Sequence, residues 1–137
     1  MTDFESKTDA DATILQLKND VQKFIADRDW EQFHDPKNVA MALASEVGEL
    51  LDLFRWIRSE KSFQVLEDEE MRTAVRMELA DITMFLVDLA SICEIDLTAS
   101  VAEKMKINAS RYPIEKARGI AKKYTQLGET ENDPPSN

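Results

Sequence analysis

Residues 45–56 read SEVGELLDLFRW, and they place three carboxylates at intervals of three inside an otherwise apolar segment. Apolar residues fill most positions between Glu46, Glu49 and Asp52. An ordinary amphipathic helix holds its acids on a face well clear of its apolar stripe. Acids at the margin of an apolar face therefore call for a chemical explanation.

A second segment, MELADI at residues 77–82, repeats the pattern. Glu78 and Asp81 are three apart, and side chains at that spacing lie on one face of a helix. The 28 residues between Glu49 and Glu78 are enough to finish one helix, turn and bring the next back beside it. Two pairs of acids from different helices could therefore face each other.

Carboxylates that converge in a partly buried space repel one another and lose solvation, so a cation is needed to keep them ionised. Oxygen ligands alone suit Mg²⁺, with Mn²⁺ as a substitute, better than zinc. A di-iron bundle would need Glu-x-x-His pairs, and the single histidine, His34, lies outside both segments. The spacing leaves two questions open. Glu49/Asp52 has the same spacing as Glu46/Glu49, and either pair could instead lie on an exposed helix face.

Apolar residues at three- and four-residue spacing predict an all-α protein. Asp35 and Pro36 mark a helix start, because Asp caps the first turn and Pro costs nothing at the first helical position. Residues 58–70 show no apolar period and are expected to form a loop. The predicted helices cover about 11–28, 36–58, 68–94, from Asp96 or Thr98 to Arg111, and a short final stretch near 114–123.

The length of 137 residues fits one domain, which we place at 11–127. Three Gly, four Pro and 7% aromatic residues argue against a β-sandwich or barrel, which needs many turns. Residues 1–10 and 128–137 are acidic and polar, and we predict that both tails are disordered. The net charge of −10 excludes a broad footprint for nucleic acid. Residues 101–127 nevertheless hold seven basic residues against two acids, which indicates a solvated helix face or a surface for a small anion.

Three features bear on the location of the protein in the cell. Cys93 is the only cysteine and lies in an apolar run, so we expect a buried thiol and a reducing compartment. The acidic start of the chain resembles neither a signal nor a transit peptide. No run of about 18 apolar residues is present, so no membrane span is expected. Together these features predict a cytoplasmic protein.

Several segments, taken in chain order, resemble one known family. EVGEL followed by MELADI is similar to the motif of the MazG-like, all-α nucleoside triphosphate pyrophosphohydrolases. RDWEQFHDPKN, EVGELLDLFRW, ELADI, KMKINASRYP and KKYTQL together resemble the dCTP pyrophosphatase branch, over about residues 20–127. The resemblance implies a MazG-like four-helix bundle with a short extra C-terminal helix. It also implies a homodimer, commonly doubled to a homotetramer.

The activity implied by this resemblance is the Mg²⁺-dependent hydrolysis of dCTP, and of modified cytosine deoxynucleoside triphosphates, between the α- and β-phosphates. The products would be the monophosphate and pyrophosphate, and the role would be nucleotide pool sanitation. The motif decides the open pairing against Asp52 and Asp88, which become supporting or surface groups. The residues that it implies as catalytic metal ligands are Glu46, Glu49, Glu78 and Asp81.

The base pocket of the branch is implied at Trp30, His34 and Trp56. Two positions depart from the branch. Phe85 stands where a tyrosine is common near the sugar or base, and Val21 stands where a histidine is common. Phe85 is kept among the expected substrate-binding residues, and both departures concern the base or sugar preference rather than the chemistry.

Phosphoryl transfer depends mainly on positioning and charge neutralisation, so it needs few reactive side chains. Metal ions on four carboxylates would activate a water and neutralise phosphate oxygens, and either Glu46 or Glu49 could accept the water's proton. The sequence shows no Ser–His or Cys–His arrangement and no Gly-rich phosphate loop, which favours direct attack by water. The candidates for holding the polyphosphate lie in the basic segment. They are Lys104, Asn108, Arg111, Lys122 and Tyr124.

Two other functions remain open at this point. One is a sister all-α pyrophosphohydrolase that acts on dUTP or on damaged purine triphosphates. The other is a helical interaction module without enzymatic activity, whose acids are solvated surface groups. The predicted helix at 68–94 is apolar on too many sides for one small bundle, and this surplus favours contacts between subunits.

Overall fold

The computed structural model describes residues 7–127, and every regular element among them is a helix, as predicted. The chain divides into two compact units, residues 1–97 and 98–137, so the single domain predicted for 11–127 stays a prediction. Residues 1–6 and 128–137, which include most of the tails predicted to be disordered, lie outside the described residues. The remainder of the predicted N-terminal tail contacts the first helix, because Lys7 Nζ donates to Asp20 Oδ2 at 2.7 Å.

The first helix, α1, covers Ile14–Ala26. Thr13 forms a capping box with Gln16: the Thr13 hydroxyl accepts from the Gln16 N–H at 3.2 Å, and Gln16 Oε1 accepts from the Thr13 N–H at 2.7 Å. This reciprocal cap satisfies two of the free N–H groups at the helix start. The predicted start at residue 11 is therefore wrong by three residues, because the sequence places its cap at Thr13.

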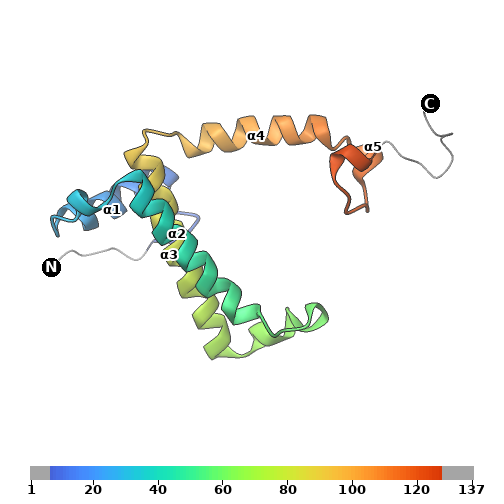
Figure 1. The fold of residues 1–137 in the computed structure, drawn as a ribbon, viewed down its shortest axis with the longest axis horizontal. Coiled ribbons are helices and arrows are strands. Elements are labelled where there is room, and N and C mark those ends of the chain that lie inside the picture. The colour runs from blue at the N-terminus through green and yellow to red at the C-terminus, as the bar shows by residue number, and fades with distance from the viewer. Residues whose placement is uncertain (1–6, 128–137) are drawn as a thin grey trace. The chain divides into compact units, whose positions relative to one another are not determined.

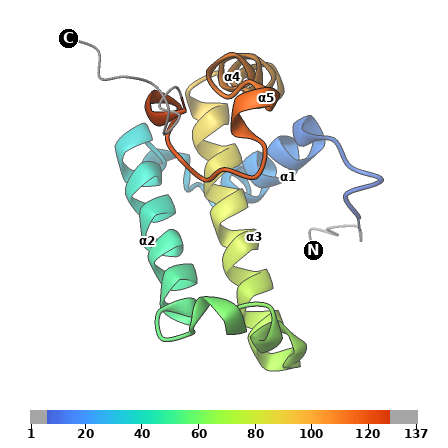
Figure 2. The same cartoon turned by 90° about the vertical axis from the view of Figure 1, so that its right-hand side faces the viewer.

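Two long helices, α2 (Pro36–Phe54) and α3 (Glu69–Ile92), run side by side in opposite directions (Figures 1 and 2). Asp35 caps α2 by accepting from the Asn38 N–H at 2.9 Å with Pro at the first helical position, which confirms the predicted start. Asp68 caps α3 in the same way through the Met71 N–H at 2.8 Å. The connector holds two short 3₁₀ turns, Ser59–Lys61 and Gln64–Glu67, so α2 ends four residues before the predicted end at 58. This hairpin of helices brings the two acidic motifs alongside each other.

Helix α3 ends in a left-handed turn. Glu94 has φ 55°, its N–H donates to the Ser91 carbonyl at 3.0 Å, and the Ile95 N–H donates to the Ala90 carbonyl at 2.8 Å. These two bonds satisfy carbonyls that the helix end leaves free. Cys93 follows the last helical residue and is exposed, so the predicted buried thiol is wrong. The apolar run that suggested burial ends with the helix.

The core of the first unit lies where α1 packs against the C-terminal half of α3. Val21 and Ile25 of α1 and Val87 of α3 are its buried residues. Partly buried side chains surround them: Leu17, Phe24, Met84 and Leu97. Burying a side chain of this size contributes roughly 1.5–3 kcal/mol. The same contact fixes the position of α1, and of the turn that follows it, beside α3.

Helix α4 (Leu97–Arg111) begins at the last residue of the first unit, and its remainder belongs to the second unit with α5 (Ile114–Ala117) and a 3₁₀ turn at Tyr124–Gln126. Helix α4 begins at Leu97, so of the two predicted caps Thr98 lies inside the helix. The final helix is much shorter than the predicted 114–123, because Arg118 leaves the helical conformation with ψ 119° and Gly119 has φ 73°. Tyr112 and Tyr124 meet edge to face with ring centroids 5.9 Å apart.

Among the described residues, no helix combines the length and the apolar character that a membrane crossing would require.

Candidate functional site

Three acids meet on the facing sides of α2 and α3. One carboxylate oxygen from each of Glu46, Glu49 and Glu78 lies within 4.8 Å of the others. Glu46 and Glu78 are half-buried, whereas Glu49 is exposed. The i, i+3 spacing on α2 and the antiparallel return of α3 bring together three of the four acids that the two sequence motifs were expected to place face to face. We call these three residues the acidic cluster.

The acidic cluster is electrostatically unsatisfied. Oε2 of Glu78 is buried and, among the side-chain atoms of residues 7–127, is the one buried oxygen or nitrogen without a hydrogen-bond partner. Partial loss of solvent raises the pKa of Glu46, and the negative charges of Glu49, Asp81 and Glu78 raise it further. A buried oxygen without a partner costs free energy, and packed like charges add to that cost. The protein alone does not offset this cost.

A divalent cation fits the acidic cluster well. The donors are all carboxylate oxygens, which is the ligand type that hard cations such as Mg²⁺ prefer. The buried Oε2 of Glu78 has a lone pair free for such an ion. The convergence within 4.8 Å allows oxygens from both helices to reach one ion. Asp81 is not in the cluster, but it is near enough to affect the pKa of Glu46, and it is exposed.

Asp81 also borders a small cavity of about 130 Å³ beside α1 and α3. Ligand pockets for drug-sized molecules usually start at about 300 Å³, so this cavity suits one part of a larger ligand. Two of the three expected base-pocket residues, Trp30 and His34, line it, together with Phe85, which was expected to bind the substrate near the sugar or base. The full lining is Val21, Phe24, Ile25, Trp30, His34, Asp81, Met84, Phe85 and Asp88. We call this space the base cavity, after the base pocket that the family resemblance predicts at Trp30 and His34.

The turn after α1 brings Trp30 and His34 to the base cavity. Asp29 adopts a left-handed conformation with φ 55°, and Gln32 Nε2 donates to both its carbonyl and its carboxylate at 2.9 Å. The Trp30 N–H donates to the Ile25 carbonyl at 3.2 Å, which folds the chain back on the helix end. The Trp30 ring packs edge-on against Phe24, with centroids 6.0 Å apart and 43% of the residue exposed. Trp30 is thus held by an edge-on contact with Phe24 while part of its surface stays exposed.

Asp88 is the residue whose environment differs most from expectation. The family resemblance implies that Asp88, like Asp52, is a supporting or surface group, but Asp88 is only 1% exposed. Its Oδ2 lies 2.7 Å from His34 Nδ1, and its Oδ1 accepts from Gln22 Nε2 at 2.7 Å. Asp52 is exposed and pairs with Arg55 at 3.2 Å, as a surface acid would.

Neither Gln22 nor the pairing of His34 with Asp88 was foreseen. The one sequence signal that pointed to this site is the position of Asp88, an acid in the most apolar part of the third predicted helix. Only the packing of α1 against α3 shows which residues satisfy it.

Trp56 does not line the base cavity. It follows α2, is 85% exposed, and has the Arg55 guanidinium 5.4 Å from its ring centroid. It borders a separate open groove of about 490 Å³ on the helical connector. The groove is lined by Trp56, Ile57, Arg58, Lys61, Gln64 and Val65. Within one chain, therefore, the structure brings Trp30 and His34 together but leaves Trp56 elsewhere.

The expected phosphate-binding residues lie in the second unit and are exposed. Lys104, Asn108 and Arg111 fall at i, i+4 and i+7 on α4, so they share one face of the helix. The Arg111 guanidinium lies 5.1 Å from the Tyr124 ring centroid, a cation–π distance. Lys122 lies just before the 3₁₀ turn that holds Tyr124.

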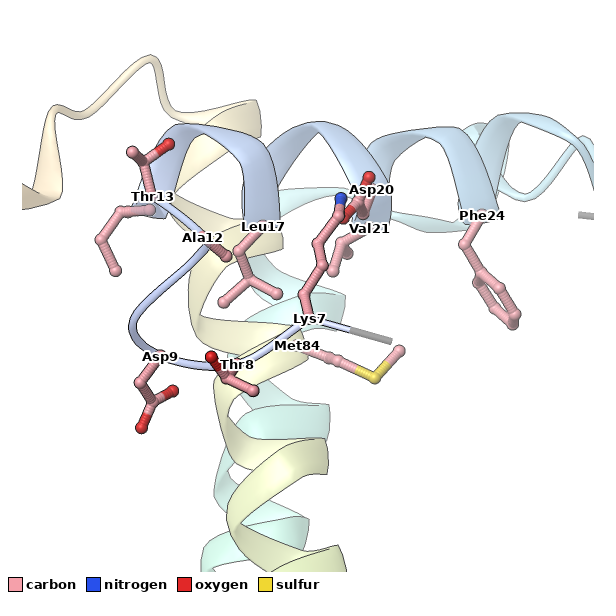
Figure 3. Close-up of a pocket in the computed structure, with 11 residues that line it drawn as sticks. Lys7, Thr8, Asp9, Ala12, Thr13, Leu17, Asp20, Val21, Phe24 and Met84 are labelled. Atoms are coloured by element: carbon pink, nitrogen blue, oxygen red, sulfur yellow. The ribbon is translucent and has the colours of Figure 1, made fainter. Parts of the chain in front are cut away.

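A larger cavity of about 690 Å³ lies between the segment at residues 7–13 and α1 (Figure 3). It shares Val21, Phe24 and Met84 with the base cavity. Two of its three charged residues are paired, because Lys7 Nζ contacts Asp20 Oδ2 at 2.7 Å, and the third is Asp9. It includes no member of the acidic cluster. The acidic cluster and the base cavity therefore remain the candidate functional site.

Comparison with known proteins places these features in a family. Residues 41–127 match the model of the MazG-like family, and this span includes the acidic cluster. dCTP pyrophosphatase 1 of Rattus norvegicus is 44% identical over 116 residues, which cover 84% of this chain and 68% of the relative. The Homo sapiens and Bos taurus proteins of the same name are each 42% identical over 115 and 118 residues, covering 84% and 86% of this chain and 68% and 70% of theirs.

A solved structure of similar sequence has a similar fold. The crystal structure of a pyrophosphatase from Archaeoglobus fulgidus superposes with a TM-score of 0.68 at 32% identity. The match covers 80% of this chain and 98% of that chain.

Proposed function

The chain belongs to the MazG-like family, and from that premise we propose that it is a nucleoside triphosphate pyrophosphohydrolase acting on dCTP. It hydrolyses the bond between the α- and β-phosphates of dCTP and of modified cytosine deoxynucleoside triphosphates. One water is consumed, and the products are the nucleoside monophosphate and pyrophosphate. Removing such nucleotides sanitises or balances the pool. The expected cytoplasmic location stays a prediction.

The observation that carries this proposal is the convergence of Glu46, Glu49 and Glu78, with one oxygen of each within 4.8 Å of the others, together with the buried Oε2 of Glu78, which has no hydrogen-bond partner. An interaction module would gain nothing from this arrangement, because it costs stability without a ligand. A cation would remove that cost. The similarity to dCTP pyrophosphatases over more than four fifths of the chain supports the same reaction.

The acidic cluster, with Asp81 beside it, would hold Mg²⁺, with Mn²⁺ as a substitute. When bound, the ion supplies positive charge for the phosphate oxygens and makes water more acidic. Glu46 or Glu49 accepts the proton of the attacking water. Trp30 and Phe85 flank the pyrimidine ring in the base cavity, where an aromatic face contacts a flat base well.

The residues outside this arrangement have proposed roles of their own. Lys104, Asn108, Arg111, Lys122 and Tyr124 bind the polyphosphate, supported by their positive charge and the shared face on α4. Trp56 contacts the base of a substrate held by a neighbouring subunit. Its 85% exposure supports this role, because a tryptophan of a monomer is seldom so free of packing.

We propose that the protein assembles as a homodimer, doubled to a tetramer. Helix α3 supports this, because Met77, Leu79 and Leu86 are 45%, 50% and 43% exposed, although an isolated bundle would bury such residues. Met41 and Leu51 of α2 are exposed as well. Light scattering after size-exclusion chromatography measures the mass directly. A monomer at all concentrations would contradict this part of the proposal.

The experiment that tests the function is a panel of the four dNTPs, dUTP, CTP, UTP, 5-methyl-dCTP and an oxidised purine triphosphate with Mg²⁺, with products separated by ion exchange. Monophosphate and pyrophosphate, formed fastest from cytosine deoxynucleotides, are the expected result. The same products from dUTP or an oxidised purine triphosphate would keep the reaction and identify a sister enzyme. No turnover together with no Mg²⁺ binding would leave a helical interaction module.

A further inference from the structure

Asp88 is a buried acid that the proposed chemistry does not use. It lies on α3 seven residues after Asp81, about 10 Å further along the helix axis. That separation matches the distance from the phosphates of an extended nucleotide to its base. Asp88 therefore sits at the end of the site where a base would be read, within the lining of the base cavity.

Asp88 has fixed hydrogen-bond partners. Gln22 donates to one of its oxygens and His34 Nδ1 meets the other, each at 2.7 Å. An ionised carboxylate can only accept, so His34 must carry its hydrogen on Nδ1. With Nδ1 protonated, Nε2 of the neutral ring is an acceptor. Among the described residues, the bond to Asp88 through Nδ1 is the hydrogen bond of the His34 ring, and the His34 side chain, 18% exposed, lines the base cavity with Nε2 open to a ligand.

We propose that Asp88, held by Gln22, is a positioning residue that fixes the tautomer of His34, so that Nε2 accepts a hydrogen bond from the exocyclic amino group of cytosine. This inference rests on the proposed function and adds the device that sets its base preference. Uracil and thymine carry a carbonyl oxygen where cytosine carries the amino group. Two acceptors would then face each other, and neither could donate a hydrogen bond to the other. Asp88 itself does not touch the base.

The tautomer can be measured without any substrate. His34 is the only histidine of the chain, so a tag-free protein labelled with ¹⁵N-histidine gives one pair of ring nitrogen signals. A long-range ¹H–¹⁵N correlation spectrum at neutral pH should show hydrogen on Nδ1 and none on Nε2. Addition of dCMP should shift the Nε2 signal, and dUMP should not. Hydrogen on Nε2, on both nitrogens, or equal responses to the two monophosphates would overturn the proposal.

Substitution of Asp88 tests the consequence for specificity. In Asp88→Ala the ring should show the mixture of tautomers of a free imidazole. The ratio of kcat/KM for dCTP over dUTP should fall by about tenfold, corresponding to the loss of one hydrogen bond. The loss should come mainly from a higher KM for dCTP, because binding of the base is affected rather than the reacting phosphate. An unchanged ratio with a changed tautomer would refute the role.

A charge-conserving exchange provides the rescue. In the double variant Gln22→Glu, Asp88→Asn, the new carboxylate at 22 can only accept, so the amide NH₂ at 88 must face it. The amide oxygen then faces Nδ1 and restores the original tautomer, and with it the preference for dCTP. Restored tautomer without restored preference would contradict the proposal. Asp27→Ala is the matched control, since Asp27 pairs with Lys23 at 2.9 Å outside the base cavity.

The outcomes also separate this inference from the proposed function. A wild-type protein that hydrolyses no nucleotide refutes the function, whatever the tautomer. Hydrolysis of dCTP with unchanged preference in Asp88→Ala refutes only the positioning role. If Asp88→Ala does not fold, the spectra of the wild-type protein with dCMP and dUMP still decide the matter.

Discussion

The acidic cluster and Asp88, which lie on the same pair of helices, have opposite surroundings. Glu78 belongs to the acidic cluster, where one buried oxygen has no partner and neighbouring carboxylates raise the pKa of Glu46. Asp88, on the same helix α3, has both oxygens engaged at 2.7 Å. The first arrangement leaves lone pairs for a ligand, and the second uses them within the protein. The difference shows that a buried acid must be interpreted by its partners rather than by its burial.

The first prediction concerns catalysis and carries the largest effect. Glu78→Gln should lower kcat/KM for dCTP by more than about a hundredfold, because losing a ligand should cost more than losing a group that only supports one. The measurement is product formation by ion exchange at saturating Mg²⁺. Asp52→Asn is the control and should retain activity, since Asp52 is exposed and pairs with Arg55. Equal activity of both variants would remove the acidic cluster from the mechanism.

The second prediction distinguishes the acidic cluster from Asp88 by the binding of Mg²⁺. Mg²⁺ at 100 times its Kd should stabilise the wild-type protein by about 2.7 kcal/mol, visible as a rise in Tm. The rise should be nearly lost in Glu78→Gln and kept in Asp88→Asn. Thermal unfolding with Mg²⁺ and with EDTA measures both. An undiminished rise in Glu78→Gln would show that the ion binds elsewhere.

The third prediction compares the free energy of unfolding without metal, which substitutions of Asp88 and Glu78 should change with opposite signs. Asp88→Ala should lower the free energy of unfolding by about 2 kcal/mol, because Gln22 and His34 each lose a bond to a buried carboxylate. Glu78→Gln should leave stability unchanged or raise it, because it removes a charge from a repulsive cluster. Urea denaturation in EDTA gives both values. Destabilisation of similar size in both variants would refute the distinction.

The fourth prediction is the smallest and depends on pH. The pKa of Glu46 is raised in the folded state by partial desolvation, then by Glu49, Asp81 and Glu78, so folding favours its protonated form. The cost of its charge is absent below the ordinary glutamate pKa and develops as the pH rises through the raised value. In EDTA, Glu46→Gln should therefore gain stability over wild type as the pH rises from the ordinary glutamate pKa through the raised value. Urea denaturation across this pH window measures the difference. A constant difference across the window would contradict the shift.

The sequence predicted the helices well where a cap is local. Asp35 with Pro36 set the start of α2, and the structure confirms it. The prediction missed where a boundary depends on left-handed backbone, as at Glu94 after α3 and Gly119 after α5. Any residue type can precede such a turn, so apolar periodicity alone extends a helix past its end. The wrong prediction of a buried thiol at Cys93 has the same cause.

The spacing of the acids was a property of the sequence alone. Three-residue intervals place Glu46 with Glu49 and Glu78 with Asp81 on single helix faces, because the helical repeat is fixed by the backbone. The length of the connector allowed the two faces to meet. The family resemblance then chose among equivalent spacings, which the periodicity could not do.

Only the tertiary structure separated Asp52 from Asp88. Both acids follow a motif on an apolar helix, and local sequence gives them the same standing. The packing of α1 on the C-terminal half of α3 buries one of them and supplies Gln22 and His34 as its partners, 66 and 54 residues away in the chain. Burial and hydrogen-bond partners are properties of contacts between distant segments. The sequence therefore determined which residues could carry the chemistry, and the fold decided which acid is free to bind a ligand and which is not.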